Sequence, residues 1–138
     1  STLQNGSAYE ATTGSDGSAT FEMVRPGEYS LILEADGYLK AAVGGVVVSF
    51  DEENQVGTAG TPVKLYAGDV NGDGKINIVD ISLAANKYGQ TGDPGWVIED
   101  LNLDGEVDIS DLTAIARNYD MTTADTTYNY KGEAPYWE

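Results

Sequence analysis

Two twelve-residue segments of this chain carry the same pattern of oxygen-bearing side chains, and they constrain its fold more than any other feature. The first spans residues 69–80 and the second spans residues 100–111, so the copies begin 31 residues apart. In both, an Asp or Asn stands at positions 1, 3, 5, 9 and 12, and a glycine stands at position 6. Glycine permits the sharp backbone turn that such closely spaced side chains need in order to converge.

This spacing is typical of a calcium-binding loop of the EF-hand kind. Calcium takes about 6–8 oxygen ligands at about 2.3–2.6 Å, and a short chain supplies them only by folding back around the ion. Position 7 gives its backbone carbonyl, position 9 often acts through water, and position 12 closes the shell with a bidentate carboxylate. We therefore expect two calcium ions, with these ligands: Asp69, Asn71, Asp73, Lys75, Asn77, Asp80, Asp100, Asn102, Asp104, Glu106, Asp108 and Asp111.

The alternative interpretation is a pair of solvated acidic turns. Two complete copies of the pattern, each followed by a helical pattern, disfavour that alternative. The apolar residues at position 8, Ile76 and Val107, predict a short bridge that pairs the two loops.

Composition excludes several classes of function. The net charge of −16 argues against nucleic acid or an anionic membrane as a partner, and no apolar run approaches the roughly 20 residues of a membrane span. The chain has no cysteine for a disulfide or thiolate zinc site, and no histidine to act as a general base. With neither a phosphate loop nor a nucleophile elbow, we expect no enzyme. The first residues do not form a signal peptide, so we expect an excised fragment.

Residues 1–66 carry short alternating segments separated by turn residues, which predicts an all-β sandwich of immunoglobulin type. The predicted strands cover residues 7–13, 18–24, 28–35, 41–50 and 61–66. The sequences DGSATF at 16–21, RPGEYSL at 25–31 and DGY at 36–38 resemble the carboxypeptidase-regulatory-like domains. The first strand or two of such domains is missing, so we expect either a trimmed sandwich or a remnant strand around Leu3.

Residues 67–122 hold the duplicated unit. Apolar residues recur at helical spacing after each loop, at identical offsets, and predict two helices whose apolar stripes face each other. The stripes consist of Ile81, Ala84, Ala85 and Tyr88 in the first copy, and of Leu112, Ile115, Ala116 and Tyr119 in the second. The residues before Asp69 indicate strand and turn, so each copy is a loop followed by a helix, without an entering helix.

Paired loop–helix repeats of this kind resemble the dockerin family over about residues 67–122. The resemblance implies a non-catalytic module that binds a cohesin and helps to assemble or anchor a cellulosome, a polysaccharide-degrading complex. A β-sandwich ahead of a dockerin is similar to the X-module–dockerin pair of scaffoldins, which attach to cell-surface cohesins. The implied organisation is a β-sandwich X module at residues 1–66, an all-α dockerin at 67–122 and a tail at 123–138.

The resemblance also implies a partner surface, a location and an oligomeric state. In dockerins, loop positions 10 and 11 and the following helix carry specificity. The corresponding residues here are Ile78, Val79, Leu83, Asn86, Lys87, Ile109, Ser110, Ala114, Arg117 and Asn118. We expect an extracellular, cell-surface-associated protein that is a monomer before it binds cohesin. Two alternatives for single elements remain: Leu83 packs under the sandwich or the tail, and the tail either contacts Tyr66 through Tyr136 or Trp137 or packs elsewhere.

Two rival functions stay open from the sequence. One is a calcium-dependent carbohydrate-binding fragment, in which Tyr9, Phe21, Tyr29 and Tyr38 form a sugar platform rather than core packing. The other is a calcium buffer or sensor, which the missing entering helices and the lack of a Met-rich groove disfavour.

Overall fold

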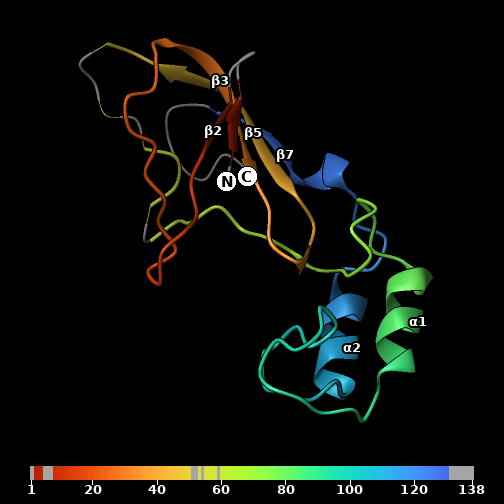
Figure 1. Ribbon diagram of the computed structural model, residues 1–138. Helices are drawn as coiled ribbons and strands as arrows, with labels where there is room; N and C mark the ends of the chain where they lie inside the picture. Colours follow the sequence, from red (N-terminus) through yellow and green to blue (C-terminus); the bar gives the residue numbers. More distant parts are fainter. Residues whose placement is uncertain (1, 5–7, 51–52, 54, 59, 131–138) are drawn as a thin grey trace. The chain divides into compact units, whose positions relative to one another are not determined.

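The computed structural model of this chain contains two compact units, each assembled from separate stretches of the sequence (Figure 1). The structure describes all residues except 1, 5–7, 51–52, 54, 59 and 131–138. The β unit comprises Ser1–Glu34, Ala41–Lys64 and Thr126–Glu138, and the helical unit comprises Ala35–Lys40 and Leu65–Asp125. A short segment from the first half of the chain therefore belongs to the helical unit.

One five-stranded sheet forms the β unit, with its strands in the order β2-β1-β3-β5-β7. The strands are β1 (Thr2–Gln4), β2 (Ala8–Glu10), β3 (Gly27–Leu33), β5 (Ala41–Val48) and β7 (Thr127–Asn129). Strands β2, β1, β3 and β5 pair antiparallel, and β7 joins β5 in parallel. Leu3 lies in β1, in register with Leu31 of β3, so a strand is present around Leu3.

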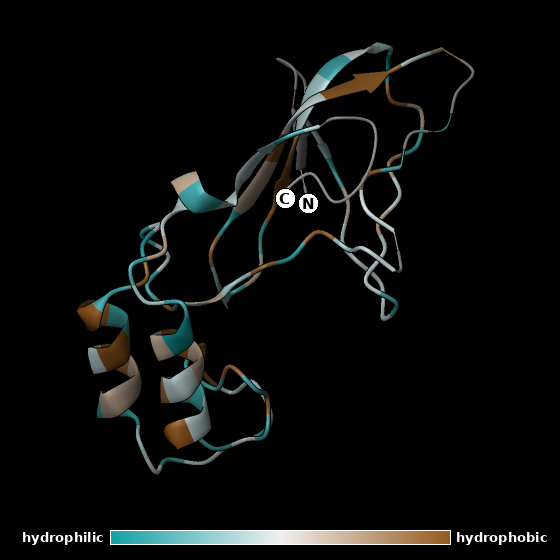
Figure 2. Cartoon of the chain, turned by 180° about the vertical axis from the view of Figure 1, so that it is seen from behind, coloured by the Kyte–Doolittle hydropathy of each residue, from teal (hydrophilic) through white to brown (hydrophobic). Residues whose placement is uncertain are grey.

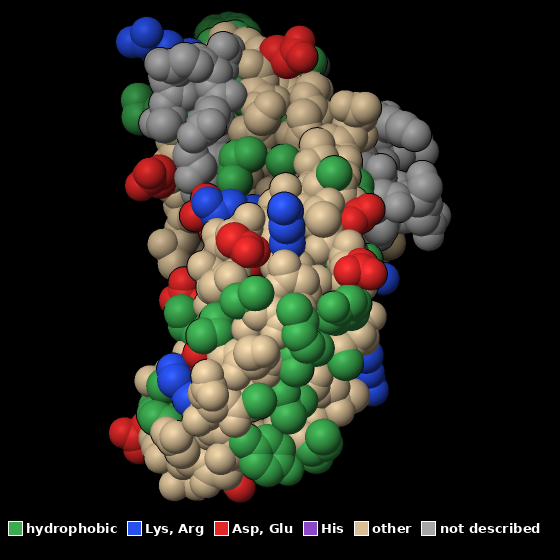
Figure 3. Space-filling view, turned by 90° about the vertical axis from the view of Figure 1, so that its right-hand side faces the viewer, with side chains coloured by type: hydrophobic (Ala, Val, Ile, Leu, Met, Phe, Trp, Pro, Cys, Tyr) green, Lys and Arg blue, Asp and Glu red, His purple; other side chains and the backbone are tan. Residues whose placement is uncertain are grey.

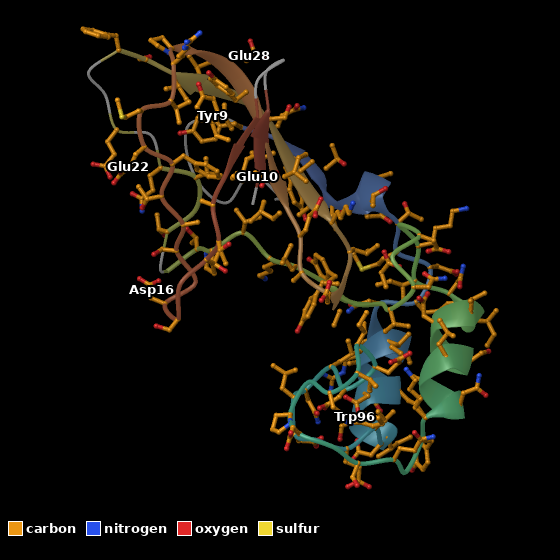
Figure 4. All side chains as sticks on the ribbon, in the orientation of Figure 1. Tyr9, Glu10, Asp16, Glu22, Glu28 and Trp96 are labelled. Atoms are coloured by element: carbon orange, nitrogen blue, oxygen red, sulfur yellow. The ribbon has the colours of Figure 1, made fainter. Side chains whose placement is uncertain are left out.

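The core of the β unit is formed by alternating residues of β3 and by valines of β5. Tyr29 and Leu31 of β3 and Val43 and Val46 of β5 are buried together. Alternation places Tyr29 and Leu31 on one face of the strand, and β-branched valines suit a pleated, half-buried surface. The rings of Tyr29 and of Tyr9, which is labelled in Figure 4, pack in a T-shaped arrangement with their centroids 5.9 Å apart.

Two helices and a two-stranded sheet form the helical unit. Its elements are β4 (Gly37–Tyr38), β6 (Ala67–Asp69), α1 (Ile78–Asn86) and α2 (Ile109–Arg117), and the 3₁₀ helix η1 (Thr123–Thr126) follows. Helices α1 and α2 lie side by side (Figure 1). Helices of nine residues are marginal alone in water, so both depend on tertiary packing. Among the described residues, no helix combines the length and apolar character needed to cross a membrane.

The core of the helical unit joins the two helices to the loops that precede them. Leu39, Ile76, Ala84 and Ile115 are each 0% exposed and pack in one cluster. Gly68 permits this packing, because a Cβ atom there would lie 3.0 Å from Ile76 Cγ2 and 3.2 Å from the Ile115 Cα. Its φ of +134° is also one that glycine adopts readily.

The buried helix faces differ in part from the predicted stripes. Ala84 and Ile115 are buried and Ile81 and Leu112 are half-buried, as predicted, whereas Ala85, Tyr88, Ala116 and Tyr119 are exposed. The two tyrosines lie beyond the last helical residues, Asn86 and Arg117, so they are not on the helices. Asp80 and Asp111 are fully buried instead. The buried face of each helix therefore includes the last aspartate of the loop that precedes it.

The predicted fold class, an immunoglobulin-like sandwich followed by an all-α module, is wrong. The described part of the β unit has one five-stranded sheet rather than two facing sheets, since residues 18–24 and 61–66 contain no strand. The helical unit is not all-α, because β4 and β6 pair within it. Alternation of apolar residues indicates an extended chain, but it does not specify the strand with which that chain pairs.

Two isoleucines of α2 provide a test of which helix face is inside. We expect Ile115→Ala, at a fully buried position, to lower the free energy of unfolding by about 2–5 kcal/mol. Ile109→Ala is the matched control, because Ile109 is 62% exposed and its truncation should cost less than about 0.5 kcal/mol. Chemical denaturation of both variants and the wild-type chain in one buffer measures these changes, and equal losses would contradict the described packing.

Candidate functional site

The first and last aspartates of both loops are buried. Asp69 is 3% exposed, Asp100 is 1% exposed, and Asp80 and Asp111 are 0% exposed. A buried carboxylate is costly unless hydrogen-bond donors or a cation compensate for its lost hydration. These four side chains therefore need compensation inside the loops, and their surroundings show where it comes from.

In the first loop, Asp80 ties the start of the loop to the start of α1. Its Oδ1 accepts hydrogen bonds from the backbone N–H of Val70 at 3.0 Å and of Asn71 at 3.4 Å. Its Oδ2 accepts from the Asn77 N–H at 2.9 Å. The carboxylate of Asp69 accepts from the N–H of Asp73 at 3.1 Å. The loop is thus wound around two inward-facing carboxylates.

The second loop repeats this arrangement. Asp111 accepts from the backbone N–H of Leu101 at 2.8 Å, of Asn102 at 3.2 Å and of Asp108 at 2.9 Å. Asp100 accepts from the N–H of Asp104 at 3.1 Å. The repeated sequence pattern therefore produces a repeated hydrogen-bond pattern.

One donor distinguishes the second loop from the first. Asp100 Oδ2 accepts from the Gly105 N–H at 3.0 Å and also from the Gly95 N–H at 2.8 Å. Gly95 belongs to the segment between the repeats, which also contains Trp96 (Figure 4). The indole Nε1 of Trp96 is buried and has no hydrogen-bond partner among the described residues. The inter-repeat segment thus fixes the first aspartate of the second loop.

The residues at loop position 9 have a role that the analysis of the sequence missed. Asn77 and Asp108 are the N-caps of α1 and α2, and they accept from the N–H of Val79 at 2.9 Å and of Ser110 at 2.7 Å. Asp80 and Asp111 complete a capping box in each helix. The signal was present, since an Asn or Asp followed three residues later by an acid predicts a helix start.

The first loop brings three carboxylates together. One ligand oxygen from each of Asp69, Asp73 and Asp80 lies within 4.8 Å of the others. Oxygens on opposite sides of a calcium ion are about 5 Å apart, twice the bond length, so this spacing fits one ion. Elsewhere in the described chain, the second loop included, no trio of acidic side chains meets that spacing.

Burial in the first loop changes the acidity of Asp69. Burial raises the pKa of Asp69 above its ordinary value of 3.8, and the neighbouring carboxylates of Asp80 and Asp73 raise it further. The backbone N–H groups of Gly74 and Asp73 oppose this shift. Burial of this carboxylate therefore outweighs the hydrogen bonds that stabilise its charged form, and a bound cation would offset that cost.

Some of the candidate partner residues are exposed, and the others make contacts within the helical unit. The exposed residues are Ile78, Val79, Asn86, Ile109, Ser110 and Arg117. Leu83 and Ala114, by contrast, are half-buried against the core of the helical unit. Lys87 Nζ donates to Glu99 Oε2 at 2.9 Å.

Asn118 is also held within the helical unit, because its side-chain amide donates to the Ala67 carbonyl at 2.8 Å. Of the remaining exposed residues, Ile78 is 60% exposed, Val79 is 47% exposed and Ile109 is 62% exposed. Figure 3 shows apolar side chains gathered on the face that carries α1, and Figure 2 shows that α1 is the more hydrophobic of the two helices. We call Ile78, Val79, Ile109 and Ser110, the residues at loop positions 10 and 11, the helix-start surface.

Three of the four aromatic residues considered for a sugar platform, Tyr9, Phe21 and Tyr29, pack in or against the core of the β unit. Tyr29 is 4% exposed in the core of the β unit, and Phe21 packs against that core. Tyr38 lies in β4 of the helical unit. The expected contact between Tyr66 and Tyr136 or Trp137 lies outside the described residues, and Tyr66 packs against the core of the helical unit.

Comparison with known proteins gives similar structures but no matching family. No family model and no curated protein matches the chain. A chain of a type II cohesin-X-dockerin complex from Acetivibrio cellulolyticus, a C-terminal interface mutant, is similar with a TM-score of 0.76 and 26% identity. An N-terminal interface mutant of that complex gives a TM-score of 0.74 and 26% identity. Both alignments cover 90% of this chain and 83% of the other chain.

The raised pKa of Asp69 predicts that protons compete with a cation in the first loop. Asp69 must lose its proton to bind the ion, and a raised pKa means that it retains the proton to a higher pH. We therefore expect calcium affinity at the first loop to fall as the pH is lowered, starting at a higher pH than an Asp with the ordinary pKa of 3.8 would give. Calorimetry over a series of pH values at constant ionic strength measures this, and an affinity that does not fall at any acidic pH would contradict it.

Proposed function

We propose that this chain is a calcium-dependent protein-interaction module that binds a cohesin, in the manner of an X-module–dockerin pair. In this proposal the β unit is the X module and the helical unit is the dockerin. The observation that carries the proposal is the duplicated loop with buried aspartates, in a chain similar over 90% of its length to a component of a cohesin-X-dockerin complex. The proposed role is non-catalytic assembly or anchoring of a cellulosome.

Each loop supplies six residues for one calcium ion. Residues 69, 71, 73, 77 and 80, with the Lys75 carbonyl, would hold the first ion. Residues 100, 102, 104, 108 and 111, with the Glu106 carbonyl, would hold the second. A bound ion supplies positive charge at the centre of the buried carboxylates. Four of these side chains are already buried in the loops without a helix ahead of either loop, because backbone N–H groups hold Asp69, Asp80, Asp100 and Asp111 in place.

The helix-start surface is the proposed contact with cohesin. Exposed apolar side chains commonly mark a protein interface. Each loop is bridged to the segment that follows the other helix, so the starts of α1 and α2 lie at opposite ends of the helix pair. The surface therefore consists of two exposed patches, Ile78 with Val79 and Ile109 with Ser110. The capping boxes fix the backbone from which Ile78, Val79, Ile109 and Ser110 project, so the surface is organised by the same loops that would hold calcium. We further propose that the chain is a monomer before it binds cohesin and that it works extracellularly at a cell surface, where calcium is abundant.

Removal of calcium should unfold the helical unit. For an affinity near 1 μM and about 1 mM calcium, linkage contributes about 4 kcal/mol per site, which is comparable to the stability of a small domain. We expect excess chelator to abolish most of the helical far-ultraviolet circular dichroism and added calcium to restore it. Magnesium is the control ion, since it demands a smaller octahedral shell of about 2.0–2.1 Å. A spectrum unchanged by chelator would contradict the structural role of calcium.

Two residues of equal exposure test the partner surface. Ile109 and Leu103 are both 62% exposed, but only Ile109 belongs to the helix-start surface. We expect Ile109→Asp to weaken binding to a cohesin by about tenfold or more, the loss of about 1.4 kcal/mol. Leu103→Asp should leave binding unchanged, and aspartate is tolerated at its φ of +58°.

An acidic residue in the first turn of a helix is favourable, so Ile109→Asp should not destabilise α2. Surface plasmon resonance against a panel of cohesins, with circular dichroism to verify folding, measures both variants. Equal losses of affinity from the two substitutions would contradict the assigned surface.

A further inference from the structure

The two loops do not pair with each other in the way the sequence suggested. The first loop instead forms a bridge with the segment that follows α2. The Thr123 N–H donates to the Gly74 carbonyl at 3.1 Å, the Ile76 N–H donates to the Met121 carbonyl at 2.9 Å, and the Asp120 N–H donates to the Ile76 carbonyl at 2.8 Å. The first loop is thus connected to the end of the second repeat.

The second loop forms the same bridge with the segment that follows α1. The Gly92 N–H donates to the Gly105 carbonyl at 2.8 Å, the Val107 N–H donates to the Gln90 carbonyl at 3.0 Å, and the Gly89 N–H donates to the Val107 carbonyl at 2.7 Å. Every donor and acceptor of the first bridge has its counterpart here in the other repeat. The two bridges therefore have one geometry and cross between the repeats.

Close packing makes both bridges sensitive to loop conformation. A Cβ atom at Gly105 would lie 2.7 Å from the Gly92 carbonyl oxygen, and a Cβ atom at Gly74 would lie 3.3 Å from Thr123 Cγ2. The φ values of these two glycines, +86° and +83°, belong to the turn at loop position 6. A loop that loses this turn also loses its bridge to the other repeat.

These contacts form a closed circuit around the helical unit. The first loop leads into α1 through the Asp80 capping box, and the end of α1 is bridged to the second loop. The second loop leads into α2 through the Asp111 capping box, and the end of α2 is bridged back to the first loop. Two continuous paths of backbone contacts therefore connect the loops, one through each helix.

We propose that the two calcium sites are reciprocally coupled through these crossed bridges, an inference that rests on the proposed calcium-dependent function. Calcium in one loop orders the end of the opposite helix and, through that helix, the other loop. The second ion therefore binds a site that is already ordered, and its binding costs less conformational entropy. Coupled sites commonly change each other's affinity by about 5–150-fold, and here the second ion binds about tenfold more tightly than the first.

A single backbone donor tests the coupling without altering a calcium ligand. Thr123→Pro removes the N–H that donates to Gly74, at the first residue of η1, where proline is tolerated. Thr123→Ala is the matched control, because it shortens the side chain and keeps that N–H. Calorimetric titration of the metal-free chains with calcium gives the two stepwise affinities. The coupling falls about threefold or more in Thr123→Pro and stays at the wild-type value in Thr123→Ala.

The outcomes separate the coupling from the proposed function. No calcium uptake by the wild-type chain overturns the proposed function and the coupling together. If the wild-type chain binds two ions independently, the coupling is wrong and the proposed function still stands. Equal coupling in the wild-type and Thr123→Pro chains shows that the crossed bridges do not carry it.

Amide hydrogen exchange gives a second readout that does not require Thr123→Pro to fold. Asp104→Asn lowers the charge of the second loop and keeps a side-chain oxygen, so one equivalent of calcium fills the first loop. The Gly89 and Gly92 amides bridge to the second loop. The coupling predicts that they exchange at least about fivefold more slowly with this one ion bound than in the metal-free chain. Slowing confined to residues 69–80 and 120–123 overturns it.

Discussion

The burial of the carboxylates of Asp80 and Asp111 is the interaction on which the rest of the helical unit depends. Each side chain is 0% exposed and accepts three backbone hydrogen bonds, two from the start of its loop and one from the N-cap of its helix. One carboxylate therefore closes the loop and begins the helix at the same time. It also turns the helix so that Ala84 or Ile115, four residues later, enters the core.

The inner and outer faces of the helical unit follow from this orientation. With Asp80 and Asp111 inward, the residues just before them project outward, and these are the helix-start surface. A cation in a loop would thus stabilise the backbone of the very residues that are proposed to contact a partner. Lys87 and Asn118 are excluded from that surface by their own internal bonds, to Glu99 and to Ala67. The proposed metal sites and the proposed interface are two consequences of one local geometry.

Local features of the structure could be predicted from the sequence, and non-local ones could not. The convergence of Asp69, Asp73 and Asp80 is local, since one turn at Gly74 brings them together. Tyr88 and Tyr119 were wrongly predicted to be buried, because both helices end before them. The burial of Asp80 was not predicted, because an Asp counts as polar in an apolar pattern.

The pairing of β7 with β5, and of β4 with β6, joins segments far apart in the chain, which alternation does not specify. The crossed bridges were not predicted for the same reason.

Counting the ions bound by the folded chain tests the central claim most directly. Native mass spectrometry after exchange into dilute calcium should find two ions per wild-type chain and fewer in a chain with Asp73→Ala, which removes an exposed member of the first carboxylate trio and leaves the buried Asp80 in place. A wild-type chain that carries no calcium, or an Asp73→Ala chain that still carries two ions, would contradict the account.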